Sequence, residues 1–225
     1  MNEKELKETI NIQAKKALDM TPEQNIKNII SKNYILENVI PRIVSFEKNW
    51  KRIDEQKLFW DTYLDFAILY HVEVENGSYA LKKDLIENLG IDKEELINKA
   101  EENLKKKKTQ IIKLEDLLSE IMEQDFTTLG LPEIKALVIT AKKEQYSANR
   151  ILNKELRKHI EEVYGENHIL LPSSVHEWIL YAGDDIDDSK FREMVKEINT
   201  KEVEQEDFLS NNVYKIEKGE LKIIE

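Results

Sequence analysis

Residues 64–74, LDFAILYHVEV, carry the pattern that decides the class of fold. Large apolar side chains occupy every second position of this stretch, which places them on one face of an extended strand. Asn76-Gly77 follows, and this dipeptide is typical of a two-residue hairpin turn because both positions accept a positive φ. The stretch therefore predicts a β-hairpin whose return strand runs from Ser78 to Leu81.

The chain before this strand has the spacing of helices. Residues 2–19 form an amphipathic pattern, and Thr21-Pro22-Glu23-Gln24 is a capping-box start for a second helix. A third helix is expected from about Tyr34 to Trp50, kinked or split at Pro41, because proline removes a backbone donor. We therefore expect a helical N-terminal segment, residues 1–55, followed by an α+β domain, residues 56–225.

Helices and strands alternate in the rest of the chain. The helices expected from caps and apolar spacing are residues 81–89 ending at Gly90, one that Asp92 caps and that ends in Lys105–Lys108, Leu114–Met122, one that Ser147 caps and Gly165 ends, and one that Asp187, Asp188 or Ser189 caps. The expected strands are Ala136–Ile139, covered on both faces, and a hairpin of Val213–Ile216 with Leu221–Ile224. This order predicts an α+β fold with a mixed, mostly antiparallel sheet and flanking helices.

The charge of the chain is concentrated near its C-terminal end. The net charge is −11, and residues 161–225 alone hold 17 Asp and Glu against 7 Lys and Arg, a net charge of −10. Such a surface repels phosphate backbones, so we expect no nucleic-acid partner through this part of the chain. A basic protein partner is the expectation that fits this charge, and a solvated surface without a partner is the alternative.

The amino-acid composition indicates the cellular compartment in which we expect the protein. The chain has no Cys, which removes disulfides and thiolate metal sites and fits a reducing compartment. Its first residues are charged and carry no apolar core of a secretory signal, and no apolar run approaches the ~20 residues of a membrane span. We expect a cytoplasmic protein that is not bound to a membrane.

Residues 170–181, LLPSSVHEWILY, gather the hydroxyl, imidazole and carboxylate groups of Ser173, Ser174, His176 and Glu177. These four are the candidate catalytic residues of a serine/histidine hydrolase. If the stretch is a β-hairpin joined by Pro-Ser-Ser, His176 and Glu177 point to opposite faces. If a helical turn begins here, residues 174–177 are a capping box, and Glu177 serves the backbone. The residues leave both structures open.

A metal-dependent nuclease is a second enzymatic alternative. Glu133-Ile134-Lys135 beside an apolar strand has the E-x-K pattern of such enzymes, with Asp116 or Asp125 as a further carboxylate. The pattern is common by chance in a chain rich in Glu and Lys. An enzyme is therefore the less favoured class for this chain.

We expect neither a resident metal nor a cofactor. The histidines at positions 71, 159, 168 and 176 lack metal-binding spacing, and His71 with Glu73 is interpreted as a surface pair. The run Asp184-Asp185-Ile186-Asp187-Asp188 lacks the glycine and glutamate of a calcium loop. Its aspartates are instead the candidate binding residues for a protein partner, at positions Asp184, Asp185, Asp187 and Asp188. A Walker loop and a dinucleotide-binding glycine pattern are both absent from the sequence.

Three C-terminal segments resemble an uncharacterised bacterial family of unknown function from Gram-positive anaerobes. They are LLPSSVHE at residues 170–177, REMVKEIN at 192–199 and VEQEDFLSNNVY at 203–214, which are similar to that family's LPSSxHE, MVxEVN and LSDxVY segments. Residues 40–49 and 64–72 are similar to its preceding segments, so the resemblance covers about residues 35–225. Thr140-Ala141 departs from the family's Thr-Asn, which puts any polar site there in doubt.

The resemblance implies the fold and an accessory role, in a phage, mobile-element or host-defence context, but no reaction. Together with the charge pattern, it favours a protein that binds another macromolecule through an acidic C-terminal surface. The hydrolase and the nuclease are the alternatives.

Overall fold

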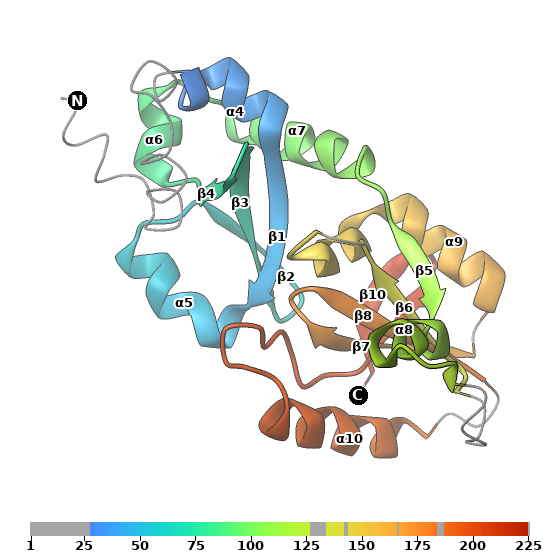
Figure 1. Cartoon of the computed structure of the whole chain (residues 1–225). Helices are drawn as coiled ribbons and strands as arrows, with labels where there is room; N and C mark the ends of the chain where they lie inside the picture. The colour runs from blue at the N-terminus through green and yellow to red at the C-terminus, as the bar shows by residue number, and fades with distance from the viewer. Residues whose placement is uncertain (1–27, 127–133, 142–143, 166, 184–186, 225) are drawn as a thin grey trace. The chain divides into compact units, whose positions relative to one another are not determined.

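The computed structural model describes residues 28–126, 134–141, 144–165, 167–183 and 187–224, and it confirms the α+β class (Figure 1). The chain divides after Lys107 into two compact units, residues 1–107 and residues 108–225, which we call unit 1 and unit 2. The division lies well beyond the boundary predicted at residue 55. Unit 1 extends across residue 55 because the strand Val39–Ser45, which precedes that residue, pairs with the strand Phe66–Val74, which follows it. The first two predicted helices fall mostly outside the described residues. No helix among the described residues is long and apolar enough to cross a membrane.

Unit 1 is built around the predicted strand, β3, Phe66–Val74. Its other elements are α4 Lys32–Asn38, β1 Val39–Ser45, α5 Phe46–Glu55, β2 Trp60–Tyr63, β4 Gly77–Ala80, α6 Lys83–Asn88 and α7 Lys93–Lys105. Strand β1 pairs along one edge of β3, while β2 and β4 pair one after the other along its other edge, all antiparallel. One face of this sheet packs against α4, α6 and α7, and the other face packs against α5.

The predicted hairpin is confirmed with a turn shifted by one residue. Val74 pairs with Gly77, which leaves Glu75 and Asn76 as the loop instead of Asn76-Gly77. The helix after it ends at Asn88 and is followed by Gly90 at φ +60, as its glycine predicted. Asp92 caps α7 by accepting a hydrogen bond from the Glu95 backbone N–H at 3.0 Å.

The prediction of one helix from Tyr34 to Trp50 is wrong. The middle of that stretch is β1, with α4 before it and α5 after it. Its β-branched residues favour a strand, and every residue of β1 except Arg42 is buried. Pro41 fits because β1 is an edge strand, where a missing N–H costs no ladder hydrogen bond. The side-chain amide of Asn103 on α7 donates to the carbonyl of Val39 at 3.1 Å.

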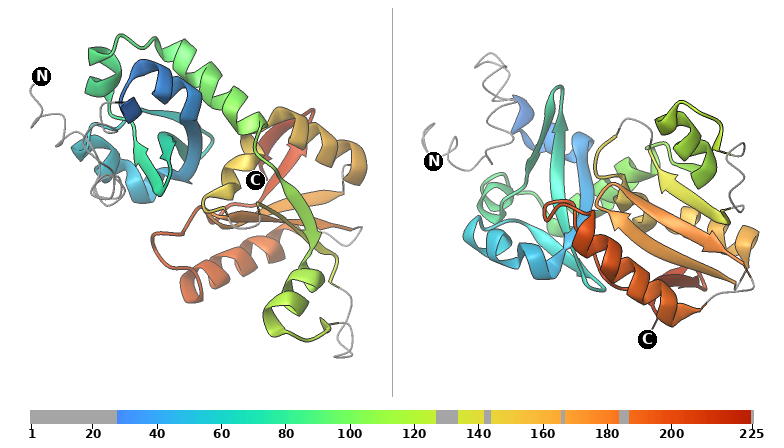
Figure 2. Two further views of the ribbon diagram at one scale, coloured as in Figure 1. Left: turned by 45° about the horizontal axis from the view of Figure 1, so that its top comes forward. Right: turned by 60° about the horizontal axis from the view of Figure 1, so that its bottom comes forward.

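Unit 2 contains one six-stranded antiparallel sheet in the order β10-β9-β7-β8-β6-β5 (Figure 2). Its elements are β5 Gln110–Lys113, α8 Leu114–Met122, β6 Ala136–Thr140, the 3₁₀ helix η2 Ser147–Leu152, α9 Lys154–Tyr164, β7 His168–Ser174, β8 Glu177–Ala182, α10 Asp188–Lys201, β9 Tyr214–Glu217 and β10 Glu220–Ile223. Strand β8 lies between β6 and β7, and its Trp178 and Leu180 are fully buried.

Most elements of unit 2 were predicted from local signals. Helix α8, strand β6 and the C-terminal hairpin are confirmed, and the hairpin turns at Lys218-Gly219 with φ values of 55° and 75°. Gly165, with φ +65, ends α9 as predicted. The predicted Ser147 cap is wrong, because Ser147 begins η2 and the α9 cap is Asn153, which accepts from the Glu155 N–H at 2.9 Å.

Two histidines are buried as neutral side chains. The surface pair predicted for His71 and Glu73 is wrong, because elements cover both faces of β3 and His71 is buried with Nδ1 3.3 Å from Ser78 Oγ. Burial, with Arg42 and Arg52 nearby, holds the pKa of His71 well below its ordinary value. In unit 2, His168 Nδ1 lies 2.6 Å from the Gly165 carbonyl, and Nε2 accepts from the Ile216 N–H at 3.1 Å.

Burial also lowers the pKa of His168. A lowered pKa in the folded state means that the unfolded chain binds more protons below about pH 6.5. We therefore expect the free energy of unfolding to be largest above pH 6.5 and to fall as the pH decreases. The measurement is urea denaturation between about pH 8 and pH 5.5. His168→Gln should weaken this dependence for unit 2, while the exposed control His159→Gln should leave it unchanged. Equal slopes for both variants would contradict the assignment.

Candidate site at the β7–β8 turn

The LLPSSVHEWILY stretch is a β-hairpin, which decides between the two structures that its residues left open. Strand β7 continues to Ser174, and Val175 and His176 form the turn before β8. The pairing slips between Pro172 and Ser174, so a bulge precedes the turn. The Ser174 Oγ accepts a hydrogen bond from the His176 N–H at 3.0 Å, so Ser174 supports the turn and caps no helix.

The backbone of the turn is held by two other segments of unit 2. The Val175 N–H donates to the Asp207 carbonyl at 2.9 Å, and the Val175 carbonyl accepts from the Ala148 N–H at 3.2 Å. The turn is thus fixed between η2 on one side and the segment after α10 on the other.

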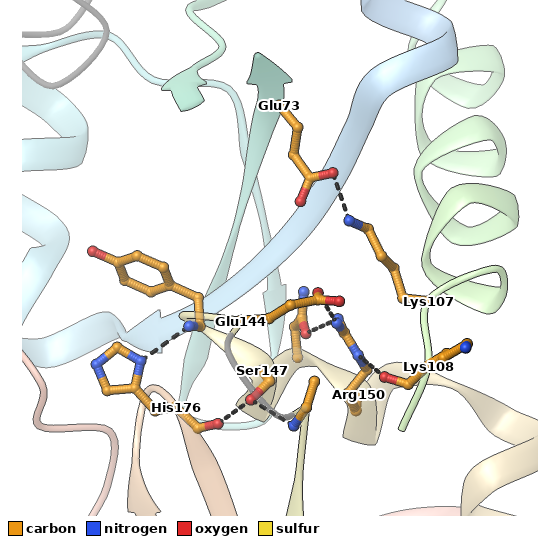
Figure 3. Close-up of polar contacts among 10 residues, drawn as sticks. Glu73, Lys107, Lys108, Glu144, Ser147, Arg150 and His176 are labelled. Carbon is orange, nitrogen blue, oxygen red and sulfur yellow. Dashed lines mark hydrogen bonds and ion pairs between the residues drawn. The ribbon is translucent and has the colours of Figure 1, made fainter. Parts of the chain in front are cut away.

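Both ring nitrogens of His176 have partners. Nδ1 accepts from the Tyr146 backbone N–H at 3.0 Å, and Nε2 lies 3.1 Å from Asp207 Oδ1 (Figure 3 shows the His176 ring and its Nδ1 contact). Nδ1 therefore carries the lone pair and Nε2 carries the proton. The Tyr146 ring packs at a tilt against the imidazole, with 5.4 Å between the two ring centroids. The lone pair that a general base would offer a serine hydroxyl is taken by a backbone N–H.

Ser173 and Glu177 form a separate pair. The Ser173 hydroxyl is hydrogen-bonded to the Glu177 carboxylate, and this bond and nearby His176 oppose the rise that burial produces in the pKa of Glu177. The four candidate catalytic residues are therefore close in space but are divided among separate contacts. The geometry brings together Ser173 with Glu177 and His176 with Asp207, and it places no hydrogen bond between the His176 imidazole and the hydroxyl of Ser173 or Ser174.

A buried polar network beneath the turn was not predicted. The Ser147 Oγ accepts from the Ala141 N–H at 3.2 Å and donates to the His176 carbonyl, so one hydroxyl joins the end of β6 to the turn (Figure 3). Arg150, also buried, pairs with Glu144 and donates to the Asn149 side chain at 2.8 Å. Ser147, Asn149 and Arg150 are polar residues that sequence patterns place on a surface, so spacing carried no signal for this network.

The predicted acidic binding residues are partly committed to helix capping. Asp184 and Asp185 lie outside the described residues. Asp187 caps α10, and hydrogen bonds from the Ser189 hydroxyl and from Lys190 lower its pKa to about 2. Asp188 is the first residue of the helix.

Exposed carboxylates gather instead after the other end of α10. Glu202, Glu204 and Glu206 are exposed, and no described cation forms an ion pair with them. Asp207 follows and contacts His176. We call Glu202, Glu204 and Glu206 the acidic segment.

The predicted nuclease residues do not gather into a site among the residues described. Glu133 lies outside them, Lys135 is exposed, and Asp116 lies in the first turn of α8. The neighbouring Glu115 accepts from the Ile134 N–H at 2.7 Å. Within the described ranges, no group of three His, Asp or Glu side chains is placed to hold a metal ion.

The family comparison decides the relationship that the C-terminal segments indicated. A family model described as Family of unknown function (DUF5688) matches residues 1–218. The chain belongs to this family. The DUF5688 match includes the N-terminal segment that the resemblance, which began near residue 35, left out. No curated protein and no solved structure matches the chain.

Ser147→Ala should destabilise unit 2. The change leaves the Ala141 N–H and the His176 carbonyl without their partner in a buried place, where an unpaired polar group costs about 1–3 kcal/mol. The free energy of unfolding, measured by urea denaturation, should therefore fall by about 1–3 kcal/mol or more. The control Thr200→Ala removes an exposed hydroxyl from α10 and should change it by less than about 0.5 kcal/mol. Equal effects would show that the Ser147 hydroxyl is not structural.

Ser174→Ala should have a smaller effect, of about 0.5–1.5 kcal/mol, because it removes one hydrogen bond at a half-buried turn. Ser174→Thr retains the hydroxyl and should restore most of the loss. A urea midpoint that does not change in Ser174→Ala would remove the turn-supporting role.

Proposed function

We propose that this protein is a binding protein that captures a basic protein partner through the acidic segment beside the β7–β8 turn. The observation that carries the proposal is the exposure of Glu202, Glu204 and Glu206 on a backbone that the fold holds in place. No Lys or Arg occurs from residue 202 to residue 207. Carboxylates without neighbouring cations create a negative potential that steers a positively charged protein surface.

Hydrogen bonds hold the acidic segment in a defined conformation. The backbone N–H groups of Asp207 and Phe208 donate to the Glu204 carbonyl at 3.0 and 3.1 Å, and the Asp207 carbonyl accepts from Val175. The Asn199 side chain on α10 donates to the Ser210 carbonyl at 2.8 Å. Fixed carboxylates lose less conformational entropy on binding than those of an unstructured acidic tail.

Exposed apolar side chains lie on α10, the helix that ends just before the acidic segment. Met194 and Ile198 are one helical turn apart on α10, and they are 38% and 45% exposed while Val195 is buried in the core. Protein interfaces combine apolar contact with a charged rim, whereas phosphate recognition requires basic groups. This combination supports a protein partner over a nucleic acid.

The hydrogen bonds of His176 also support binding over hydrolysis. A serine hydrolase needs a free imidazole lone pair beside a hydroxyl, and here Tyr146 and Asp207 occupy both nitrogens. The His176–Asp207 contact instead links the turn to the acidic segment.

Charge reversal of the acidic segment should abolish capture of the partner. The triple variant Glu202→Lys, Glu204→Lys and Glu206→Lys changes exposed side chains and should stay folded by circular dichroism. In affinity capture from native lysate with mass spectrometry, it should lose proteins of high isoelectric point that the unaltered protein retains. Their binding to the unaltered protein should weaken as salt is raised, because exposed charges are screened.

The matched control reverses three exposed carboxylates of unit 1, at Glu37, Glu87 and Glu101, and produces the same change in net charge. This control should retain the basic proteins. If both triple variants lose them equally, net charge and not the acidic segment governs capture. If neither variant loses any protein, the proposal fails.

A further inference from the structure

Glu177, the first residue of β8, carries a half-buried carboxylate with few partners. The hydroxyl of Ser173, which is also half-buried, donates a hydrogen bond to it. No Lys or Arg within the described ranges forms an ion pair with this carboxylate, and the proton of neighbouring His176 points to Asp207. Burial raises the pKa of Glu177, so folding disfavours its ionised form. Ionisable groups in such surroundings gather at binding and catalytic sites.

Helix α10 runs along β8 in the opposite direction (Figure 1). The Phe191 ring, near the start of the helix, packs on Tyr181, near the end of β8, with 4.9 Å between the ring centroids. One helical turn later, Val195 packs in the same apolar cluster as Ile179. The chain that leaves α10 then reaches the β7–β8 turn, where the Asp207 carbonyl accepts a backbone hydrogen bond. The C-terminal end of α10 therefore lies toward this turn.

This direction brings Glu177 level with the exposed apolar side chains of α10. Glu177 shares one face of β8 with Ile179 and Tyr181, because side chains alternate along a strand. Seven helical residues from Phe191 to Ile198 span about 10 Å, and four strand residues from Tyr181 to Glu177 span about 13 Å. Both spans begin at the same ring contact and run in the same direction. A half-buried carboxylate and exposed apolar side chains thus occupy one part of the unit 2 surface.

We propose that Glu177 is the subsite for an arginine side chain of the basic partner. This inference rests on the proposed function and names the contact that gives it specificity. A guanidinium is planar, always charged and less strongly hydrated than an ammonium, so it pairs with a half-buried carboxylate at a smaller desolvation cost. The Ser173 hydroxyl restricts the rotation of the carboxylate, which offers its remaining acceptor positions to the guanidinium.

The acidic segment and Glu177 have different tasks in this arrangement. The exposed carboxylates of the acidic segment attract any cationic surface over a distance, and salt screens them. Glu177 acts only in contact, where a partly buried charge pair is screened less and depends on the geometry of the donor. The methylene groups of an arginine side chain can pack on Met194 and Ile198 while its guanidinium reaches the carboxylate.

The test compares two peptides of equal charge, octaarginine and octalysine, by isothermal titration calorimetry with the full chain. The unaltered protein should bind octaarginine about tenfold more tightly, which is the effect of one charge-assisted hydrogen-bonded pair. Glu177→Gln preserves the size of the side chain and an acceptor for Ser173 but removes the charge. This variant should lose the preference through weaker binding of octaarginine, while its affinity for octalysine should stay within about twofold.

Glu217→Gln is the matched control. This carboxylate also belongs to unit 2 and its side chain is 38% exposed, but Lys215 and Lys222 already pair with it. The control removes the same charge and should keep the preference for octaarginine. The urea midpoint of Glu177→Gln should not fall, because folding disfavours the ionised carboxylate that this change removes.

The subsite is overturned if the unaltered protein shows no preference, if Glu177→Gln keeps the preference, or if Glu217→Gln loses it equally. A lower urea midpoint for Glu177→Gln would assign the carboxylate to the fold and would overturn the subsite too. Charge reversal of the acidic segment should weaken the binding of both peptides and leave the ratio of their affinities unchanged. If that reversal weakens neither peptide, the proposed function fails, whereas a preference that Glu177→Gln does not change overturns only the subsite.

Discussion

The hydroxyl of Ser147 is the contact on which the centre of unit 2 depends. It accepts from the backbone at the end of β6 and donates to the backbone of the β7–β8 turn, and the Ser147 side chain is itself buried. Directly beside it, the indole N–H of Trp178 donates to the Ala148 carbonyl at 2.8 Å, so the largest buried side chain of β8 is oriented by the same 3₁₀ helix. Central strands can be buried on both faces because η2 satisfies the polar groups at their ends.

This arrangement explains why the candidate catalytic residues have structural roles. A turn that projects from two buried strands must satisfy its own backbone groups, and Ser174, Ala148 and Asp207 provide those partners. The imidazole of His176 then joins Tyr146 and Asp207, which lie 30 residues before it and 31 residues after it along the chain. A surface built on such a turn is held by the core, and the acidic segment shares that support through Asp207.

Sequence reasoning predicted the elements whose signals are local and missed those that tertiary contacts decide. The alternation in β3, the Asp92 cap and Gly165 act within a few residues, and each has its predicted place in the structure. Strand β1 was missed because its apolar residues also satisfy a helical period, and only pairing with β3 decides between the two. His71 was assigned to a surface because alternation indicates two faces, without showing that helices cover both.

The candidate site shows the same limit for charge. The density of aspartates at residues 184–188 marks the most acidic stretch of the sequence, but a carboxylate at the first turn of a helix already accepts hydrogen bonds from nearby donors, as Asp187 does. Residues 202–206 alternate acidic with uncharged side chains and look less distinctive. The fold makes these carboxylates available to a partner, because the segment follows the end of α10 and backbone hydrogen bonds connect it to the β7–β8 turn. The charges that a surface offers to a partner are therefore those of carboxylates that do not accept hydrogen bonds from the backbone.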